Sequence, residues 1–275
     1  TGTGTATPGT SPSGNVQETN ARDVPNAGNP NPRGVDARTG GLPSVLPSGA
    51  VPILPTKFAL IIANSESRMP GQAIPFALED ARRIKDALVA SAGYDAANIE
   101  VVTNTTSAQL MATAKALASR VADQGTVFLY YTGAGTNING RDYLAGVDTE
   151  LATDTSSMVR KSDLYRPFVE KGASIFAFYQ VNRPIVNGRY FGAEIPELGR
   201  IAQSQATIPG EKVNGIYREG TLVGLYSDAV VSILGEFRSN RIPINEFGWQ
   251  VFYRIRRGDS GTSGGGGRQT PTLPT

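Results

Sequence analysis

The chain has 275 residues, enough for one large domain or two small ones. It carries 26 lysines and arginines and 24 aspartates and glutamates, and this net charge of +2 gives no reason to expect nucleic acid or an anionic membrane as a partner. The absence of histidine and cysteine excludes a Ser–His or Cys–His catalytic pair, a Cys/His zinc site and any disulfide.

Residues 1–56 are predicted to form a low-complexity arm in which threonine, glycine, proline and serine predominate. Such a segment buries too little apolar surface to offset its ordering entropy, so alone it is expected to be disordered. Its two apolar stretches, 42–46 and 51–55, are expected to anchor it on the folded domain or on a neighbour. No apolar run approaches the roughly 20 residues that span a bilayer, so no membrane span is predicted.

A folded domain is predicted over residues 57–258, and its first half alternates strands with helices. These elements are a strand at 58–63, a helix at 77–88, a strand at 99–103, a helix from 107 and a strand at 126–131. Thr106 and Gln109 have the spacing of a capping box at the start of the second helix, and Gly93 is expected to end the first. This order implies a parallel sheet with right-handed crossovers and helices on its faces.

The second half of the domain is less regular. It is predicted to contain the return of a small hairpin at 140–145, a short helix at 162–171, a strand at 173–178, an irregular excursion at 179–220, a fifth sheet strand at 221–226 and a last helix before Gly258. Residues 259–275, which begin with a glycine-rich run, are predicted to be a second flexible arm.

The stretch Thr132–Gly135 follows the central strand and contains two glycines, which favour a sharp turn. Loops that leave the carboxyl ends of parallel strands are where ligands and catalytic groups lie, so an active site is expected here. None of its side chains is a strong acid, base or nucleophile. Four tyrosines could line a groove at this edge, although core packing is their commoner role: Tyr130, Tyr131, Tyr143 and Tyr179.

Other chemistries find little support in the sequence. Four acidic residues could hold calcium through oxygen ligands, but they lack an EF-hand pattern and a solvated acidic loop is favoured: Asp142, Asp148, Glu150 and Asp154. Gly133 and Gly135 lack the third glycine of a dinucleotide-binding loop. Ser65 and Thr132 follow strands but have no histidine to activate them. No metal and no cofactor is therefore expected.

The order of these elements and six short motifs resemble the caspase-like superfamily, which includes metacaspases and bacterial orthocaspases. The motifs are Phe58–Asn64, Leu78–Arg82, Phe128–Gly135, Asn139–Asp148, Gly220–Leu225 and Gln269–Pro271. Each is weak alone, but six in the right order are fairly specific. The resemblance implies a three-layer α/β sandwich, with a mostly parallel central sheet and helices on both faces, flanked by extended arms.

The departures from the family pattern bear on function. Ala134 occupies the position of the family's general base, a histidine, and Gln180 that of its cysteine nucleophile. Phe178 occupies the position of an acidic residue that helps to line the pocket for a basic substrate side chain. Neither a methyl group nor a carboxamide can replace a thiolate–imidazole pair. An engineered inactivation would not also change the acidic position and remove every other histidine and cysteine, so we favour a natural pseudoenzyme.

The resulting hypothesis is a binding or scaffold subunit without catalytic residues. Partners are expected at residues 1–55 and 259–275, and a vestigial groove is expected around Thr132, Gly133, Gly135 and Tyr179. An active peptidase that uses unconventional residues is the alternative. Because of the arm's composition and the start at Thr1, which a removed leader would explain, we expect a bacterial periplasmic or secreted protein, with a cytoplasmic location as the alternative.

Overall fold

The computed structural model divides the chain into two units, residues 1–44 and 45–275. The residues that it describes are 1–2, 54, 56–184, 186, 194, 199–238, 243–257 and 269–275. The predicted N-terminal arm therefore lies almost wholly outside the described residues, and every helix and strand named below belongs to the second unit. No helix in the described ranges is long and apolar enough to cross a membrane.

A seven-stranded sheet forms the centre of this unit. Its strands are β1 (Lys57–Ala63), β2 (Ile99–Thr103), β3 (Thr126–Ile138), β4 (Arg141–Ala145), β5 (Met158–Arg160), β6 (Ser174–Asn182) and β7 (Arg200–Gln205). Five strands are parallel, in the order β2-β1-β3-β6-β7, and β4 and β5 extend the far end of β3 in antiparallel fashion. The predicted mostly parallel sheet is confirmed.

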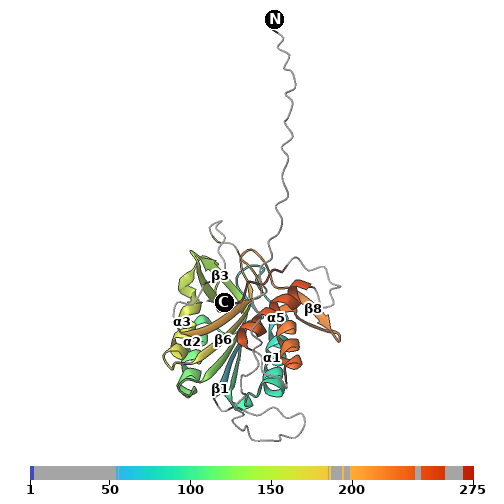
Figure 1. The fold of residues 1–275 in the computed structure, drawn as a ribbon. Coiled ribbons are helices and arrows are strands. Elements are labelled where there is room, and N and C mark those ends of the chain that lie inside the picture. The colour runs from blue at the N-terminus through green and yellow to red at the C-terminus, as the bar shows by residue number, and fades with distance from the viewer. Residues whose placement is uncertain are drawn as a thin grey trace, which may run out of the picture. The chain divides into compact units, whose positions relative to one another are not determined.

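Helices cover both faces of the sheet (Figure 1). They are α1 (Ala77–Ala92), α2 (Ser107–Arg120), α3 (Lys161–Val169), α4 (Leu225–Glu236) and α5 (Ile244–Arg257), with single 3-10 turns η1 (Ala96–Asn98) and η2 (Thr155–Ser157). Helices α2 and α3 pack on one face, and α1, α4 and α5 on the other. The three-layer sandwich is thus confirmed.

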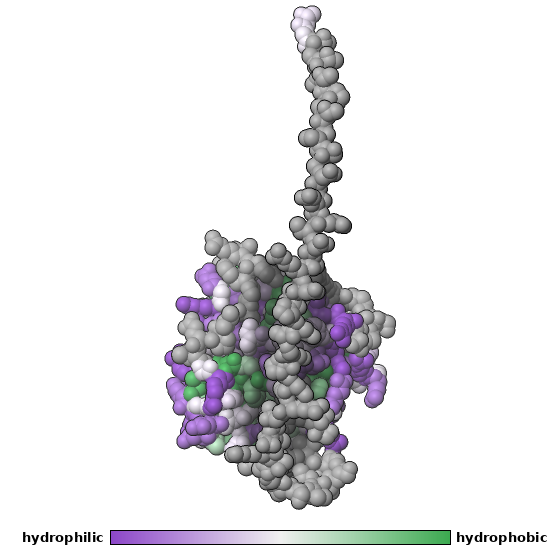
Figure 2. Space-filling model, viewed as in Figure 1, coloured by the Kyte–Doolittle hydropathy of each residue, from purple (hydrophilic) through white to green (hydrophobic). Residues whose placement is uncertain are grey.

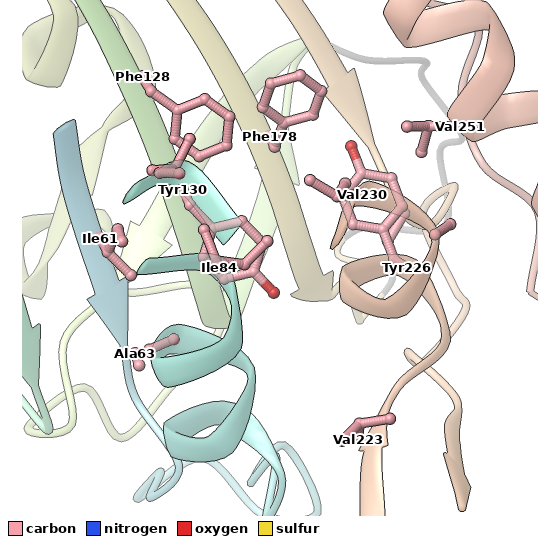
Figure 3. Close-up of a cluster of buried hydrophobic side chains, with 14 of the residues drawn as sticks. Ile61, Ala63, Ile84, Phe128, Tyr130, Phe178, Val223, Tyr226, Val230 and Val251 are labelled. Atoms are coloured by element: carbon pink, nitrogen blue, oxygen red, sulfur yellow. The ribbon is translucent and has the colours of Figure 1, made fainter. Parts of the chain in front are cut away.

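The strict alternation of a strand sorts its buried side chains between two cores. Along β3, Tyr131 joins the core under α2 and α3, whereas Phe128 and Tyr130 join the core under α1, α4 and α5. Figure 3 shows this second core, where the rings of Phe128 and Phe178 stack between neighbouring strands with centroids 5.1 Å apart. The same alternation continues along β3 and β6. It therefore decides which face of the sheet each candidate site residue lies on.

Local signals in the sequence are confirmed at the helix ends and at the hairpin. Thr106 and Gln109 form a complete capping box, and Gly93 ends α1 with a left-handed φ of 70°. Asn139 and Gly140, with φ of 52° and 79°, form the tight turn between β3 and β4.

Two predictions in the second half are wrong. The expected sheet strand at 221–226 is β9 (Thr221–Gly224), which pairs only with β8 (Gly215–Arg218) in a separate hairpin, and α4 begins at Leu225. All of residues 225–230 are buried, so this helix has no one-sided periodicity in its sequence. The fifth strand of the parallel sheet is instead β7, whose Gln203, Ser204 and Gln205 lack the apolar run of a buried strand.

The last seven residues also differ from the expected flexible arm. Gln203 and Thr275 exchange two backbone hydrogen bonds of 2.8 and 3.0 Å, so this segment lies along the outer edge of β7. Asn214 N donates to Gln269 Oε1 (2.6 Å), and Pro274 packs close to Gly248 of α5. The remainder of the predicted arm, 259–268, lies outside the described residues.

Deleting residues 269–275 is expected to lower the free energy of unfolding by about 2–4 kcal/mol and to promote aggregation. The deletion removes at least five hydrogen bonds, each worth about 1 kcal/mol net, and exposes an edge strand. Urea denaturation and light scattering measure the two effects. Unchanged stability would show that the segment contributes nothing to the fold, and replacing Leu273, which is 57% exposed, with Ser serves as the mild control.

Candidate functional site

The candidate site lies at the carboxyl ends of β1, β3 and β6. Thr132 on β3 is paired in register with Ala63 of β1 and with Gln180 of β6. The structure therefore brings Thr132, Gly133 and Ala134 next to Phe178 and Gln180, as the resemblance implies. Gln180 is in register with Thr132, whereas Ala134 is in register with Asn182. Ala134 therefore lies on the same face as Gln180 but two positions further along the strand, not directly opposite it.

Residues 132–135 form part of a strand, so the prediction of a loop here is wrong. Strand β3 continues to Ile138, and neither glycine has a positive φ. Both glycines are instead required by close packing. A Cβ at Gly133 would lie 2.7 Å from the hydroxyl of Tyr131, and a Cβ at Gly135 would lie 2.6 Å from the carbonyl oxygen of Tyr143. The glycines here allow neighbouring atoms to approach the backbone closely, and they do not form a turn.

Gln180 is fully buried and all of its amide is engaged. Its Nε2 donates to Asp80 Oδ2 (2.6 Å) and Thr132 Oγ1 (3.2 Å), and its Oε1 accepts from the backbone N of Ser227 (3.0 Å). A buried amide with these partners connects α1, β3 and the first turn of α4. Gln180 thus acts as a structural link in the interior.

Asp80 is the acidic member of this cluster, and it is not among the candidate site residues predicted from the sequence. Its Oδ1 accepts from Gly224 N (2.8 Å), and a Cβ at Gly224 would overlap the side chains of both Gln180 and Asp80. Burial raises the pKa of Asp80 to about 6, although hydrogen bonds from Ser227, Gly224 and Gln180 partly oppose that rise. The available signal was its place on α1: Asp80 lies beside Ala81 on the apolar face that packs on the sheet, where a buried carboxylate needs partners.

Ala134 lies in a small apolar cluster. It packs with Met69, Ala145 and Met158, and is only 3% exposed. Its register partner Asn182 donates to Gln72 O (3.1 Å) and accepts from Val213 N (2.9 Å). The segment after β1 therefore covers this end of the two strands.

The other two site residues on β6 contribute to packing. Phe178 stacks on Phe128 and meets Phe247 of α5 edge to face, with centroids 5.4 Å apart. Tyr179 belongs to the core under α2 and α3, and its hydroxyl donates to Tyr165 (2.7 Å). Tyr179 is therefore on the opposite face of the sheet from Gln180, and does not line a groove with Thr132.

A second buried polar cluster surrounds Asp142, beside the carboxyl end of β6. Its two oxygens accept five hydrogen bonds, from Asn137 Nδ2 (2.7 Å), Arg183 Nη2 (2.6 Å), Lys161 Nζ (2.6 Å), Gln205 Nε2 (2.9 Å) and Glu194 N (2.9 Å). Burial alone would raise the pKa of Asp142, but Lys161 and Arg183 hold it well below its usual range. Burial lowers the pKa of Lys161, which Asp142 partly offsets.

The four acidic residues considered for calcium are not brought together. Asp142 is buried in the cluster above, and Glu150 pairs with Arg68 at the surface. Asp148 accepts from Ser107 N (3.3 Å), and Asp154 caps η2 through Ser156 N. Across the described ranges, no group of three or more acidic side chains is placed to hold a metal ion.

Comparison with known proteins supports the resemblance. The family model described as a caspase domain matches residues 56–236, which extend from the residue before β1 to the end of α4. The matched range includes Asp80, Ala134 and Gln180. No curated protein matches the chain.

Proposed function

Since the chain belongs to the caspase-domain family, we propose that it is a non-catalytic member, a binding or scaffold subunit within a larger assembly. The observation that carries this proposal is Gln180. It stands where the resemblance expects the nucleophile, is fully buried, and uses its amide in three hydrogen bonds. A carboxamide so engaged can neither attack a carbonyl nor transfer a proton.

The covered strand ends favour scaffolding over peptide capture in the vestigial groove. Ala134 packs with Met69, and Asn182 is held by Gln72 and by the backbone of Val213. A substrate peptide needs open main-chain partners beside the reacting groups. We therefore expect partners to bind outside this groove, and the arm 1–55 to be required for their recruitment.

The alternative, a peptidase with unconventional residues, finds no activated hydroxyl among the described candidates. Thr132 Oγ1 is buried and accepts from Gln180 Nε2. Ser65 Oγ donates to Asn104 Oδ1 (3.1 Å), an amide oxygen that cannot act as a strong base. A serine or threonine nucleophile requires a base that removes its proton.

A scanning peptide library should therefore remain uncleaved in the presence of the protein. Incubation at pH 6, 7 and 8, read by mass spectrometry beside an active peptidase of the family, measures this. Cleavage that disappears in Thr132→Ala or Ser65→Ala would contradict the proposal and support the alternative. Cleavage that persists equally in both variants and in a mock purification indicates a contaminating protease.

The partner role is tested separately from turnover. Pull-down from the native source with the full chain and with a chain lacking residues 1–55 shows which part recruits partners. We expect the shortened chain to lose them. Retention of the same partners would restrict the binding surface to residues 56–275 and contradict the role of the N-terminal arm.

A further inference from the structure

A trough runs between α2 and α3, on the face of the sheet opposite the partners that Gln180 has on α1 and α4. Its volume is about 650 Å³. Among the described helices, three cover the other face of the sheet and only two cover this one. Figure 2 shows hydrophobic residues exposed among hydrophilic ones where Figure 1 places α2 and α3. The proposed function does not yet use this surface.

The walls of the trough are two helical stripes. Its lining residues on α2 follow the spacing i, i+4 and i+7, and those on α3 follow i, i+3 and i+4. They are Met111, Lys115 and Ala118 on α2, and Asp163, Arg166 and Pro167 on α3. The α2 stripe extends for about two helical turns, or about 11 Å. Two neighbouring helix faces of this length form a groove in which a third helix can lie.

Methionine contributes to the apolar lining of this trough. Met111 and Met158 both line it, together with Val159 and Pro167. The whole chain has three methionines, so two of the three lie at one surface groove. Met111 is partly buried against the core under α2 and α3. Because its unbranched side chain can adapt to an incoming surface, methionine is well suited to receive the apolar stripe of another helix.

The charged residues of the lining are mostly basic. There are four cations and two carboxylates: Lys115, Arg160, Arg166 and Lys171 against Asp163 and Glu170. Two of the cations are paired, since Arg160 lies 2.7 Å from Glu194 and Arg166 lies 2.6 Å from Asp163. These pairs contribute little to the net charge that a partner would meet.

The two lysines of the lining supply the remaining positive charge. Lys115 is exposed and forms no ion pair with any described residue. Lys171 approaches Asp123 at 3.9 Å, but the Asp123 side chain is 88% exposed, so this pair is weak. Glu170 is the lining carboxylate that opposes the two lysines. The trough therefore keeps an excess of one positive charge and favours an acidic partner.

We propose that this trough binds an acidic amphipathic helix of a partner protein. The apolar stripe of that helix would lie against Met111 and Met158, and its acidic side chains beside Lys115 and Lys171. This inference rests on the proposed binding role, because it names one surface that holds a partner. Its failure is distinguishable from failure of that role: a trough that binds no helix would leave the peptide-library result and the role of the N-terminal arm unchanged.

The test titrates the full chain, labelled at its methionine methyl groups, with three blocked peptides of equal length. The first is an alanine-based helix with leucines at i, i+3, i+4 and i+7 and glutamates on its other face. The second replaces every glutamate with lysine, and the third has the composition of the first without its apolar stripe. We expect the first peptide to bind at least about tenfold more tightly than the other two.

The readout is the set of methionine methyl signals in NMR spectra. Saturable shifts are expected at Met111 and Met158, whereas Met69, which does not line the trough, is the internal reference. Absence of a saturable shift with the first peptide would overturn the site. Equal affinities of the first and third peptides would do so as well, because they would show that the apolar stripe is not recognised.

Two charge reversals locate the binding surface on the domain. Lys115→Glu, at an exposed position, should weaken binding of the glutamate peptide about fivefold and strengthen binding of the lysine peptide. Lys85→Glu on α1, which covers the other face of the sheet, is the matched control and should change neither affinity. Equal effects of the two variants would contradict the assignment to this trough.

Light scattering of the free chain separates a foreign partner from a second copy of the chain. We expect no change in its mass when the glutamate peptide is added, beyond that of the peptide itself. A dimer that this peptide dissociates would overturn the proposal of a foreign helix and assign the trough to self-association.

Discussion

Replacing Asp142 with Ala should lower the free energy of unfolding by about 3–5 kcal/mol, enough to leave much of the protein unfolded at 37 °C. The carboxylate lies between Lys161 and Arg183, both of which have side chains that are 2% exposed. Its removal leaves two buried cations without a counter-ion. Thermal and urea denaturation followed by circular dichroism measure the loss.

Asp148→Asn, which changes an acidic residue just after the strand β4 that carries Asp142, is the matched control. Asp148 accepts one weak hydrogen bond of 3.3 Å from Ser107 N and forms no ion pair with any described residue, so a loss of at most about 1 kcal/mol is expected. Equal losses in both variants would mean that the Asp142 cluster has no special energetic role. Asp142→Asn is expected to fall between them, since it keeps the shape but removes the charge.

The pH dependence of folding stability that this cluster causes follows from the direction in which the pKa of Asp142 is shifted. The pKa of Asp142 is depressed in the folded protein, so the stabilisation is present above the pKa of the unfolded chain and is lost as pH falls toward the folded value. Acid should therefore destabilise the wild type through Asp142. In the Asp142→Ala variant this part of the acid sensitivity should disappear.

Replacing Gln180 with Glu should lower the free energy of unfolding by about 3–5 kcal/mol at pH 8. The new carboxylate would lie where Nε2 now donates to Asp80 over 2.6 Å, and two buried carboxylates at that distance cannot both be ionised. Much of the loss should be recovered at pH 5, where the pair shares a proton. Urea denaturation at the two pH values measures the difference.

The exchange Asp80→Asn with Gln180→Glu is the decisive control. The asparagine introduced at position 80 could accept from Gly224 N and donate to the glutamate introduced at position 180. The second oxygen of that glutamate could accept from Ser227 N, so these partners of the present cluster are restored. The double variant should recover most of the stability lost in Gln180→Glu at pH 8. A double variant as unstable as the sum of the two single variants would show that these groups are not coupled.

Asp80 itself has the opposite pH behaviour to Asp142. Burial raises its pKa from 3.8 to about 6, so the folded protein holds this proton more tightly than the unfolded chain does. The stabilisation is complete below pH 3.8 and is lost as pH rises through about 6, a span of about 3 kcal/mol at 1.36 kcal/mol for each pKa unit. The free energy of unfolding, measured by urea denaturation, should therefore fall gradually between these pH values in the wild type. This part of the fall should be absent in the Asp80→Asn variant.

The proposed loss of activity also has a structural consequence. Gln180→Cys would remove the bonds that the amide now makes to Asp80 Oδ2 and Ser227 N, and Ala134→His would place a larger polar group in the apolar cluster with Met69. The amide at position 180 therefore supports the fold that surrounds it. A thiol and an imidazole introduced at these two positions would therefore disturb contacts with α1, with α4 and with the segment after β1.

Local patterns in the sequence were sufficient for the first half of the fold. The strands β1, β2 and β3, the helices α1 and α2, and the cap at Thr106 follow from apolar periodicity and capping chemistry, because these signals act over one or two turns of chain. The sequence by itself also determined that no histidine or cysteine is present, and hence that no thiol–imidazole pair can form. The resemblance placed Ala134 and Gln180 on neighbouring strand ends, as the register shows.

Only the tertiary structure decided which polar side chains are buried and which groups they form hydrogen bonds with. Gln180 and Asp80 are 100 positions apart in the chain, and Asp142 and Gln205 are 63 apart, so no spacing rule connects them. The same holds for β7, where the buried side chains of Gln203 and Gln205 are hydrogen-bonded by the distant groups of Tyr165 and Asp142. A buried polar residue can be recognised only with its partners, and folding alone brings those partners together.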